Sequence, residues 1–404
     1  MPDRSPNTTS RLAARLQRRR EALRQRPRLY AAIMGIVVAF LAALAWPFTI
    51  AHLQSIAVLD LVANKPVPLL LRRVVAEPIT TRDLTLPLPS GAVRARLYTP
   101  VHHPDAPAIV VLHGVHHLGM DEPRLVAFAS AMASCGIRVL TPELPDIKDY
   151  HVGANSIATI GDSAAWLAQQ SGNHPVGIMG LSFSGGLSLL AAASPEWRPS
   201  IKFVVTIGSQ DEMSRVADFY LTGYDQLPDG SVETIKPHEY GALVLEYENL
   251  KDFVPAPADL EPIRAVLRAH LYEDHAGEIA ATARLTPAQL ALATQLMDTT
   301  SPATRKLLAA AETRHIQEMA GVSPHGHLAT LTTPVYLLHG AGDNIIPSAE
   351  TQWMEAELPS ETLKAALISP VLSHLDMDGA NPTFADQLRL VHFFALVLHA
   401  AESR

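Results

Sequence analysis

The stretch VGIMGLSFSGGLSLLAAA, residues 176–193, decides how the chain is expected to fold. Its first residues are apolar or glycine, as in a strand that is buried on both faces. After Ser182 and Ser184, a run of small and apolar residues continues long enough for a helix. The stretch therefore predicts a strand, a sharp turn that carries serine, and a helix.

The segments on either side of this turn alternate between strand and helix patterns. Residues 82–100 predict two strands around a turn at residues 89–91. Further strands are expected over residues 108–114, 137–144, 201–208, 333–343 and 362–369, with helical segments between most of them. This alternation predicts an α/β fold, in which helices cover both faces of a mostly parallel sheet.

The alternation stops between residues 209 and 331. This part contains amphipathic helical segments such as DLEPIRAVLRAHLYEDHA, joined by polar connections that contain proline. We therefore expect one core, formed by residues 81–208 and 332–404, that is interrupted by a helical insertion over residues 209–331.

The N-terminal part is basic and precedes a long apolar run. Residues 1–28 contain nine arginines and two acidic residues, and residues 29–53 contain no charged side chain. Such a run is long enough to cross about 30 Å of hydrocarbon as a helix. We predict a basic cytoplasmic arm (1–28), a transmembrane signal-anchor helix (29–51) and a linker (52–80).

The arginines also predict an orientation. Positive charge before a membrane helix favours a cytoplasmic N-terminus, so the domain that follows is expected on the far side of the membrane, periplasmic or extracellular in a bacterium. The alternative is a signal peptide that is cleaved near residues 43–45.

The composition excludes other classes of site and partner. The chain has 404 residues, a net charge of −8 and a single cysteine, Cys135. One cysteine excludes an intramolecular disulfide and a zinc site with several cysteines. Because the basic residues are concentrated in the N-terminal arm, nucleic acid is not an expected partner.

Both serines at the turn are candidate nucleophiles. A serine hydroxyl needs a base within hydrogen-bond reach, a group that orients the base, and donors for the oxyanion. Ser182 follows the strand after one linker residue, which is the nucleophile's place in a strand–turn–helix elbow. Ser184 would lie within the first helical turn. We expect Ser182 to be the nucleophile and Ser184 to be a small residue that lets helix and strand pack.

Candidates for the acid and the base follow later strands. Asp343 comes at the end of the strand over 333–343, and His374 lies in the loop after the last strand. Because parallel strands end at the same sheet edge, these side chains should lie near the serine. They also complete the chain order Ser, Asp, His. Asp211 is the alternative acid, and His325 and His327 are the alternative bases.

The loop after residues 108–114 contains further candidates. The backbone N–H groups of Phe183 and Val115 are expected to form the oxyanion hole. His113, His116 and His117 are expected to face the substrate, although these loop residues could equally serve only to stabilise the turn. No carboxylate completes a helical zinc motif with them, so no metal is expected.

Four segments together resemble the α/β-hydrolase superfamily: VVLHG, GLSFSGG, LLHGAGDNIIP and SHLD, in this order and at strand ends. The resemblance covers roughly residues 82–400, interrupted by the insertion, and Ser184 departs from it where glycine is expected. It implies an eight-stranded, mostly parallel sheet, a helical cap between the sixth and seventh strands, and serine-dependent hydrolysis of an ester, thioester or amide. It does not identify the substrate, because this fold supports many activities.

The sequence thus predicts a membrane-anchored serine hydrolase of the carboxylesterase or lipase kind. Its triad would be Ser182, Asp343 and His374, and its substrate a small-molecule or lipid-like acyl compound. No cofactor is expected. The alternative is a non-catalytic module of the same fold that binds a ligand or a partner.

Overall fold

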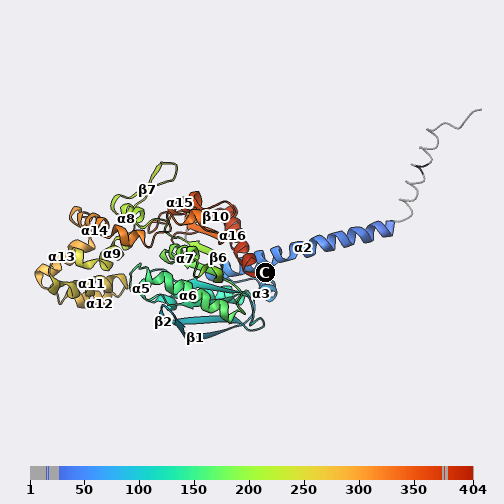
Figure 1. Ribbon diagram of the computed structural model, residues 1–404, viewed down its shortest axis with the longest axis horizontal. Coiled ribbons are helices and arrows are strands. Elements are labelled where there is room, and N and C mark those ends of the chain that lie inside the picture. Colours follow the sequence, from blue (N-terminus) through green and yellow to red (C-terminus); the bar gives the residue numbers. More distant parts are fainter. Residues whose placement is uncertain (1–14, 16, 18–26, 375–376, 378–380, 404) are drawn as a thin grey trace, which may run out of the picture. The chain divides into compact units, whose positions relative to one another are not determined.

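The computed structural model describes residues 15, 17, 27–374, 377 and 381–403 (Figure 1). Almost all of the predicted basic arm therefore lies outside the described residues. The chain divides into two compact units, Met1–Ile50 and Ala51–Arg404.

The boundary between the units lies within one helix, α2 (Pro27–Val62). In the described part of the chain, α2 is the helix that is long and apolar enough to cross a membrane, judged over Ala45–Val62. Many large apolar side chains between Tyr30 and Phe48 are exposed. This part of α2 agrees with the predicted apolar helix by length and composition.

The end of α2 belongs to the second unit. Ala51, Ala57 and Val58 are fully buried there, and the hydroxyl of Ser55 donates to the carbonyl of Val391 at 2.7 Å. Residues 52–62, expected as part of a linker, instead continue the helix. The cause is their helical spacing of small and apolar residues, which gives them a face to bury.

An eight-stranded sheet forms the centre of the second unit, in the order β1-β2-β4-β3-β5-β6-β9-β10. β2 pairs antiparallel with β1 and β4, and the other neighbours are parallel. The strands are β1 (Ile79–Leu88), β2 (Gly91–Pro100), β3 (Ala108–Leu112), β4 (Arg138–Pro142), β5 (Val176–Leu181), β6 (Ile201–Ile207), β9 (Val335–Gly340) and β10 (Leu363–Ser369). This confirms the predicted mostly parallel sheet.

Helices cover both faces of this sheet, and every residue of β3 and β4 is buried. Side chains along β3 alternate between two apolar clusters. Val110 and Leu112 belong to one cluster, and Ile109 and Val111 to the other. The covering helices are α4 (Pro123–Ser134), α6 (Asn155–Gln170), α7 (Phe183–Ala193), α15 (Ala349–Glu357) and α16 (Phe384–Glu402). Shorter helices are α3 (Leu69–Val75) and α5 (Pro145–Lys148), with 3-10 turns η1 (Gly119–Asp121), η2 (Arg198–Ser200), η3 (Pro257–Asp259) and η4 (Leu328–Thr330).

The insertion between β6 and β9, called the cap below, is mostly helical. In α11, Ile263, Val266, Leu267 and Leu271 are buried at helical spacing, so one face of the helix packs inward. The cap helices are α8 (Met213–Thr222), α9 (Glu239–Glu248), α10 (Leu250–Phe253), α11 (Leu260–Leu271), α12 (His275–Thr282), α13 (Pro287–Met297) and α14 (Pro302–Ala320). A hairpin of β7 (Tyr224–Gln226) and β8 (Val232–Thr234) was not expected, because these strands are too short and too polar to show a strand pattern.

Candidate active site

Ser182 occupies the sharp turn between β5 and α7. Its φ of 56° and ψ of −136° lie in a region that residues with a side chain rarely adopt. The N–H of Ser182 donates to the carbonyl of Ile207, at the end of β6, at 2.8 Å. Such backbone strain costs on the order of 1–3 kcal/mol and persists only where the surroundings hold it. Strand, neighbouring strand and helix thus fix the hydroxyl at the sheet edge.

Two glycines allow α7 to approach β5 closely. A Cβ on Gly180 would lie 2.4 Å from the Cα of Gly185, and a Cβ on Gly185 would lie 1.9 Å from the Oγ of Ser209. Both distances are too short for any side chain. The turn of backbone at Ser182 therefore depends on glycine at these two positions.

Ser184 is fully buried beneath the turn. Its hydroxyl donates to the carbonyl of Leu181 at 2.7 Å and accepts from the N–H of Leu181 at 2.9 Å. These bonds hold the last residue of β5 against the first turn of α7. Ser184 therefore does more than fill space, because its side chain closes the turn by hydrogen bonding.

Ser182, His374 and Asp343 form one hydrogen-bonded line at the ends of β5, β10 and β9. The Nε2 atom of His374 lies 3.0 Å from the Oγ of Ser182. Its Nδ1 atom lies 2.5 Å from the Oδ2 of Asp343. With a proton on Nδ1, the imidazole donates to the carboxylate and can accept the proton of the serine hydroxyl.

Asp343 is buried and accepts hydrogen bonds through both oxygens. Its Oδ1 accepts from the N–H groups of Ile345 and Ile346, each at 2.9 Å. Burial alone would raise the pKa of Asp343, but the charge of His374 and the hydrogen bonds from His339 and His374 hold this pKa below its usual value. Asp343 is therefore ionised at neutral pH.

A second histidine, His339 on β9, lies on the same carboxylate, and the sequence reasoning did not single it out. Its Nε2 is 2.8 Å from the carbonyl of Ile346 and 3.3 Å from the Oδ2 of Asp343. Since a carbonyl only accepts, Nε2 carries the proton, and Nδ1 accepts from the hydroxyl of Thr351 at 2.7 Å. The available signal was a histidine four residues before the acid, at the end of the same strand.

Gly208, directly after β6, is a further residue that the sequence reasoning missed. Its φ is +62°, and a Cβ there would lie 3.3 Å from the Oδ2 of Asp343 and 3.4 Å from the Nδ1 of His374. Glycine avoids the strain of this backbone conformation, and a Cβ here would make a tight contact with the pair.

The expectation that His113 faces the substrate is wrong. His113 is buried, its Nδ1–H donates to the carbonyl of Gly114 at 2.8 Å, and its Nε2 accepts from the N–H of Leu144 at 2.9 Å. Burial lowers the pKa of His113 to about 4, so the ring is neutral. The ring joins the ends of β3 and β4, and neither nitrogen is left for a substrate.

The rest of this loop packs against the cap. The carbonyl of Val115 accepts from the hydroxyl of Tyr240 on α9 at 2.8 Å. The half-buried rings of His116 and His117 stack on each other at 4.6 Å, and His117 stacks on Tyr272 at 4.4 Å. The loop that was expected to supply an oxyanion donor is therefore held in place by the cap.

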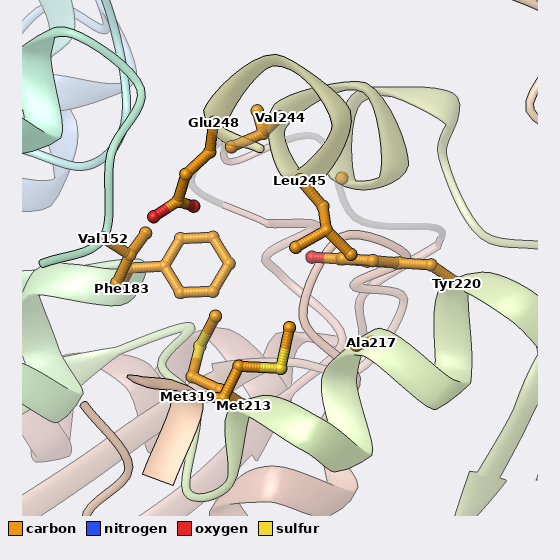
Figure 2. Close-up of a pocket in the computed structure, with 10 residues that line it drawn as sticks. Val152, Phe183, Met213, Ala217, Tyr220, Val244, Leu245, Glu248 and Met319 are labelled. Atoms are coloured by element: carbon orange, nitrogen blue, oxygen red, sulfur yellow. The ribbon is translucent and has the colours of Figure 1, made fainter. Parts of the chain in front are cut away.

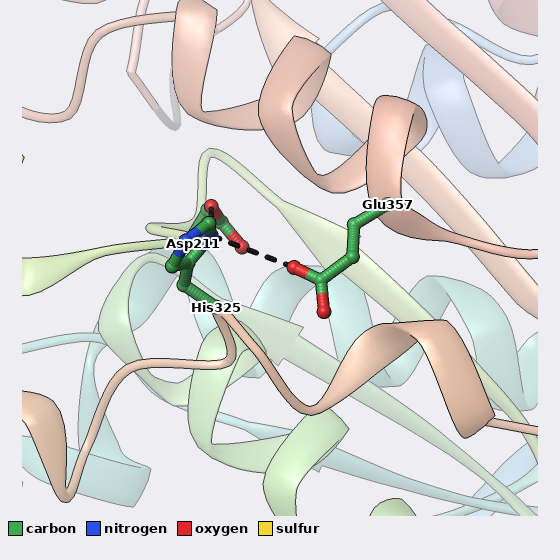
Figure 3. Close-up of side chains that lie close together, drawn as sticks. All are labelled: Asp211, His325 and Glu357. Carbon is green, nitrogen blue, oxygen red and sulfur yellow. Dashed lines mark hydrogen bonds and ion pairs between the residues drawn. The ribbon is translucent and has the colours of Figure 1, made fainter.

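The alternative acid, Asp211, and one alternative base, His325, contact each other instead of His374 (Figure 3). The Nδ1 of His325 lies 3.1 Å from Asp211 and 3.5 Å from Glu357. Burial, together with the charge of Glu350, raises the pKa of Asp211 to about 6. The other alternative base, His327, is exposed.

Within the described residues, the side chains of Asp211, His325 and Glu357 lie close enough together to hold a metal ion. Their ligand atoms are all within 4.8 Å of one another. However, the guanidinium of Arg215 already donates to the Oδ2 of Asp211 at 2.8 Å. Arg215 also pairs with the buried carboxylate of Glu350. Positive charge from the protein itself is thus present at this cluster.

A small cavity of about 20 Å³ lies between the start of α7 and the cap (Figure 2). It can hold one small group, such as a methyl group or a water molecule. Its walls are mostly apolar, and they are formed by Val152, Phe183, Met213, Ala217, Tyr220, Gly241, Val244, Leu245, Glu248 and Met319.

No protein-family model matches the sequence, and no curated protein matches it. Among solved structures, the chain is similar to an esterase from Pyrobaculum calidifontis, with 16% identity, coverage of 87% of this chain and 92% of that chain, and a TM-score of 0.43. It is similar to carboxyl esterase 2 from Tuber melanosporum, with 16% identity, coverage of 80% and 88%, and a TM-score of 0.44. It is also similar to a 2-hydroxy-6-oxo-6-phenylhexa-2,4-dienoate hydrolase from Rhodococcus sp. strain RHA1, with 17% identity, coverage of 77% and 97%, and a TM-score of 0.38.

The chain's own architecture carries the assignment of the fold. The sheet has eight strands and is mostly parallel, the cap lies between β6 and β9, and a serine lies on the elbow after β5. With these features together, the chain has the α/β-hydrolase fold.

Proposed function

We propose that this chain is a serine hydrolase that cleaves carboxylic esters through an acyl-enzyme. The observation that carries the proposal is the hydrogen-bonded line from Ser182 through His374 to Asp343. Nucleophile, base and orienting acid have the contacts that the chemistry needs, and the nucleophile lies on a strained turn.

In the first half of the reaction, the Oγ of Ser182 attacks the carbonyl carbon of the ester and its proton passes to the Nε2 of His374. The tetrahedral intermediate collapses when the bond to the alcohol oxygen breaks, and the alcohol leaves with the proton from His374. In the second half, water attacks the acyl-enzyme, again giving its proton to His374. The bond between the acyl carbon and the Oγ of Ser182 then breaks, His374 returns its proton to that oxygen, and the acid is released, while Asp343 stays ionised throughout.

The oxyanion would be held by the backbone N–H groups of Phe183 and Val115. Phe183 is the first residue of α7, so its N–H has no partner within the helix. The helix start also carries partial positive charge, which favours a developing anion. Val115 follows β3, at the same edge of the sheet, and removal of one such donor typically costs about 10²–10³ in kcat.

Anchoring of the enzyme in a membrane is part of the proposal. Exposed apolar side chains of α2 between Tyr30 and Phe48 support it, and so do the arginines before them. Because Ala51, Ala57 and Val58 are buried in the second unit, the lipid-facing part of the proposed 29–51 anchor is expected to end before Ala51. The N-terminus would be cytoplasmic and the catalytic domain on the other side. A phosphatase reporter fused after residue 53 should be active outside the cytoplasm, and activity of a cytoplasmic reporter at that point would reverse the orientation.

The proposed reaction is tested by turnover of p-nitrophenyl esters with acyl chains of graded length, using the full chain in detergent. We expect Ser182→Ala to reduce kcat by about 10⁶. The matched variant Ser184→Ala, which removes the neighbouring hydroxyl and its hydrogen bonds to Leu181, should lose far less turnover than Ser182→Ala. Equal turnover by wild type and Ser182→Ala would contradict the proposal. The same acyl group presented as a thioester and as an anilide distinguishes esterase from thioesterase and amidase activity.

A further inference from the structure

The hydroxyl of Tyr220 is a buried hydrogen-bonding group whose position on α8 faces a cavity. Tyr220, on α8, is 8% exposed, and its hydroxyl oxygen has no hydrogen-bond partner within the described residues. Leaving such a group unpaired is unfavourable, and native proteins rarely do so without a reason.

This hydroxyl lies in the wall of the cavity beside the elbow. Figure 2 shows the phenol oxygen pointing inward, below Leu245 and toward the side that Phe183 forms. Apart from Glu248, the other residues of the wall have apolar side chains or, in Gly241, no side chain. Glu248 is paired with His151 at 2.6 Å. Tyr220 is therefore a polar side chain of the wall whose hydroxyl has no partner within the described residues.

The position of the ring is fixed by its packing. A Cβ added to Gly241 on α9 would lie 2.3 Å from the ring of Tyr220 and 2.7 Å from its hydroxyl oxygen. The ring thus lies directly against the backbone of α9. A hydroxyl held in this way is positioned before a ligand arrives, which is the condition for specific recognition.

The phenol acts as a hydrogen-bond donor at every working pH. Burial, followed by the negative charges of Asp343 and Glu350, raises the pKa of Tyr220 well above its usual value.

From these observations, and on the basis of the proposed esterase function, we infer that the cavity receives the end of a short acyl chain that carries an oxygen acceptor for the hydroxyl of Tyr220. A hydroxyl, ether or keto oxygen supplies such an acceptor. The small volume limits the chain end to one small group. Phe183, which follows the proposed nucleophile in the sequence, lines the cavity, and the assignment of the cavity to the acyl side is part of the inference.

The inference is tested with pairs of p-nitrophenyl esters in which an ether oxygen replaces one methylene, for example 3-methoxypropanoate against pentanoate. The oxygen is moved along the acyl chain over the set. The ratio of kcat/KM for each pair is measured in wild type and in Tyr220→Phe. Since the intrinsic reactivity of each pair is the same with both enzymes, the change in this ratio isolates the hydroxyl.

We expect the ratio to fall by about tenfold or more in Tyr220→Phe for at least one position of the oxygen. Tyr224→Phe, a matched variant at an exposed tyrosine outside the cavity, should leave the ratio unchanged. A ratio that Tyr220→Phe leaves unchanged at every position would overturn the inference. A second matched pair, 2-methoxyethyl butanoate against butyl butanoate, carries the oxygen in the alcohol portion, and dependence on Tyr220 in this pair alone would overturn the assignment to the acyl side.

A binding measurement separates this inference from the proposed reaction. Ser182→Ala and Ser182→Ala/Tyr220→Phe are titrated by NMR with 3-methoxypropanoic acid, pentanoic acid and the other acids of the same set. Tighter binding of an ether acid that is lost with Tyr220→Phe supports the inference even if the wild type cleaves no ester. Equal preference in the two variants contradicts it even if the ester reaction is confirmed.

Discussion

His339 and His374 approach the same carboxylate oxygen: the Nε2 of His339 lies 3.3 Å, and the Nδ1 of His374 lies 2.5 Å, from the Oδ2 of Asp343. One histidine is fully buried in the sheet, and the other lies in the loop after β10. The buried histidine therefore holds the acid in the orientation that the other one needs.

Replacing His339 should misplace the acid without removing it. His339→Leu is expected to lower kcat by about tenfold to a hundredfold, because Asp343 loses one of its fixed donors. His339→Gln, which retains a donor, should restore part of this loss. The measurement is kcat and KM for one ester across pH. A fall in protein stability with unchanged kcat and an unchanged pH profile would show that His339 acts only in packing.

Removing the acid itself should have a larger effect. Asp343→Asn should lower kcat by about 10⁴, because His374 loses the partner that sets its tautomer. Asp211→Asn serves as the comparison, since Asp211 pairs with Arg215 and His325 instead. Asp211→Asn should leave kcat unchanged and lower the free energy of unfolding. The opposite result for these two variants, measured by ester turnover, would exchange their roles.

Adding a methyl group at Gly208 should disturb the triad directly. The positive φ costs about 1–2 kcal/mol in any L-residue, and the new Cβ would press on Asp343 and His374. Gly208→Ala is therefore expected to lower both the free energy of unfolding and kcat.

Gly230→Ala is the matched control. It lies at φ +85° with open space around it and introduces similar strain outside the site. The free energy of unfolding from chemical denaturation and kcat from ester turnover are measured for both variants. Equal kcat values for Gly208→Ala and Gly230→Ala would contradict a direct effect of the new Cβ on Asp343 and His374.

Glu246 on α9 should make the stability of the cap depend on pH. The side chain is fully buried, both carboxylate oxygens lack partners within the described residues, and burial raises its pKa to about 9. In the unfolded chain, the pKa is near 4.3, so the folded state is increasingly disfavoured as the pH rises from there to about 9.

The variant Glu246→Gln removes this dependence. It should raise the free energy of unfolding by about 3–4 kcal/mol at pH 7 and have much less effect at pH 4, where the carboxyl is protonated in the folded state and mostly protonated in the unfolded chain. The measurement is urea denaturation at several pH values. A gain that is independent of pH would show that the carboxyl does not titrate in this way.

Much of the candidate site follows from the sequence because strand ends position side chains. Once residues 176–193 are assigned to a strand, a turn and a helix, Ser182 falls at the sheet edge, and Asp343 and His374 follow at the ends of later strands. The acid Asp211 also follows a strand, but its contact with Arg215 depends on how the cap packs. Sequence spacing carries no information about such a contact.

Other features depend on contacts between segments that are distant in the chain. His113 resembles a substrate-facing loop residue until its bond to Leu144 is seen. In the sequence, His339 cannot be distinguished from an ordinary strand residue, because its contact with Asp343 forms only when the chain folds back after β9. Residues 52–62 were expected in a linker because the apolar run of α2 weakens there, although the helix continues and packs on the core.

The most direct test of the central claim is labelling of the folded full chain with a fluorophosphonate probe, followed by mass-spectrometric mapping of the adduct. The account predicts one adduct, on Ser182, that is absent in Ser182→Ala and retained in Ser184→Ala. An adduct on Ser184, or no adduct on well-folded protein, would contradict it.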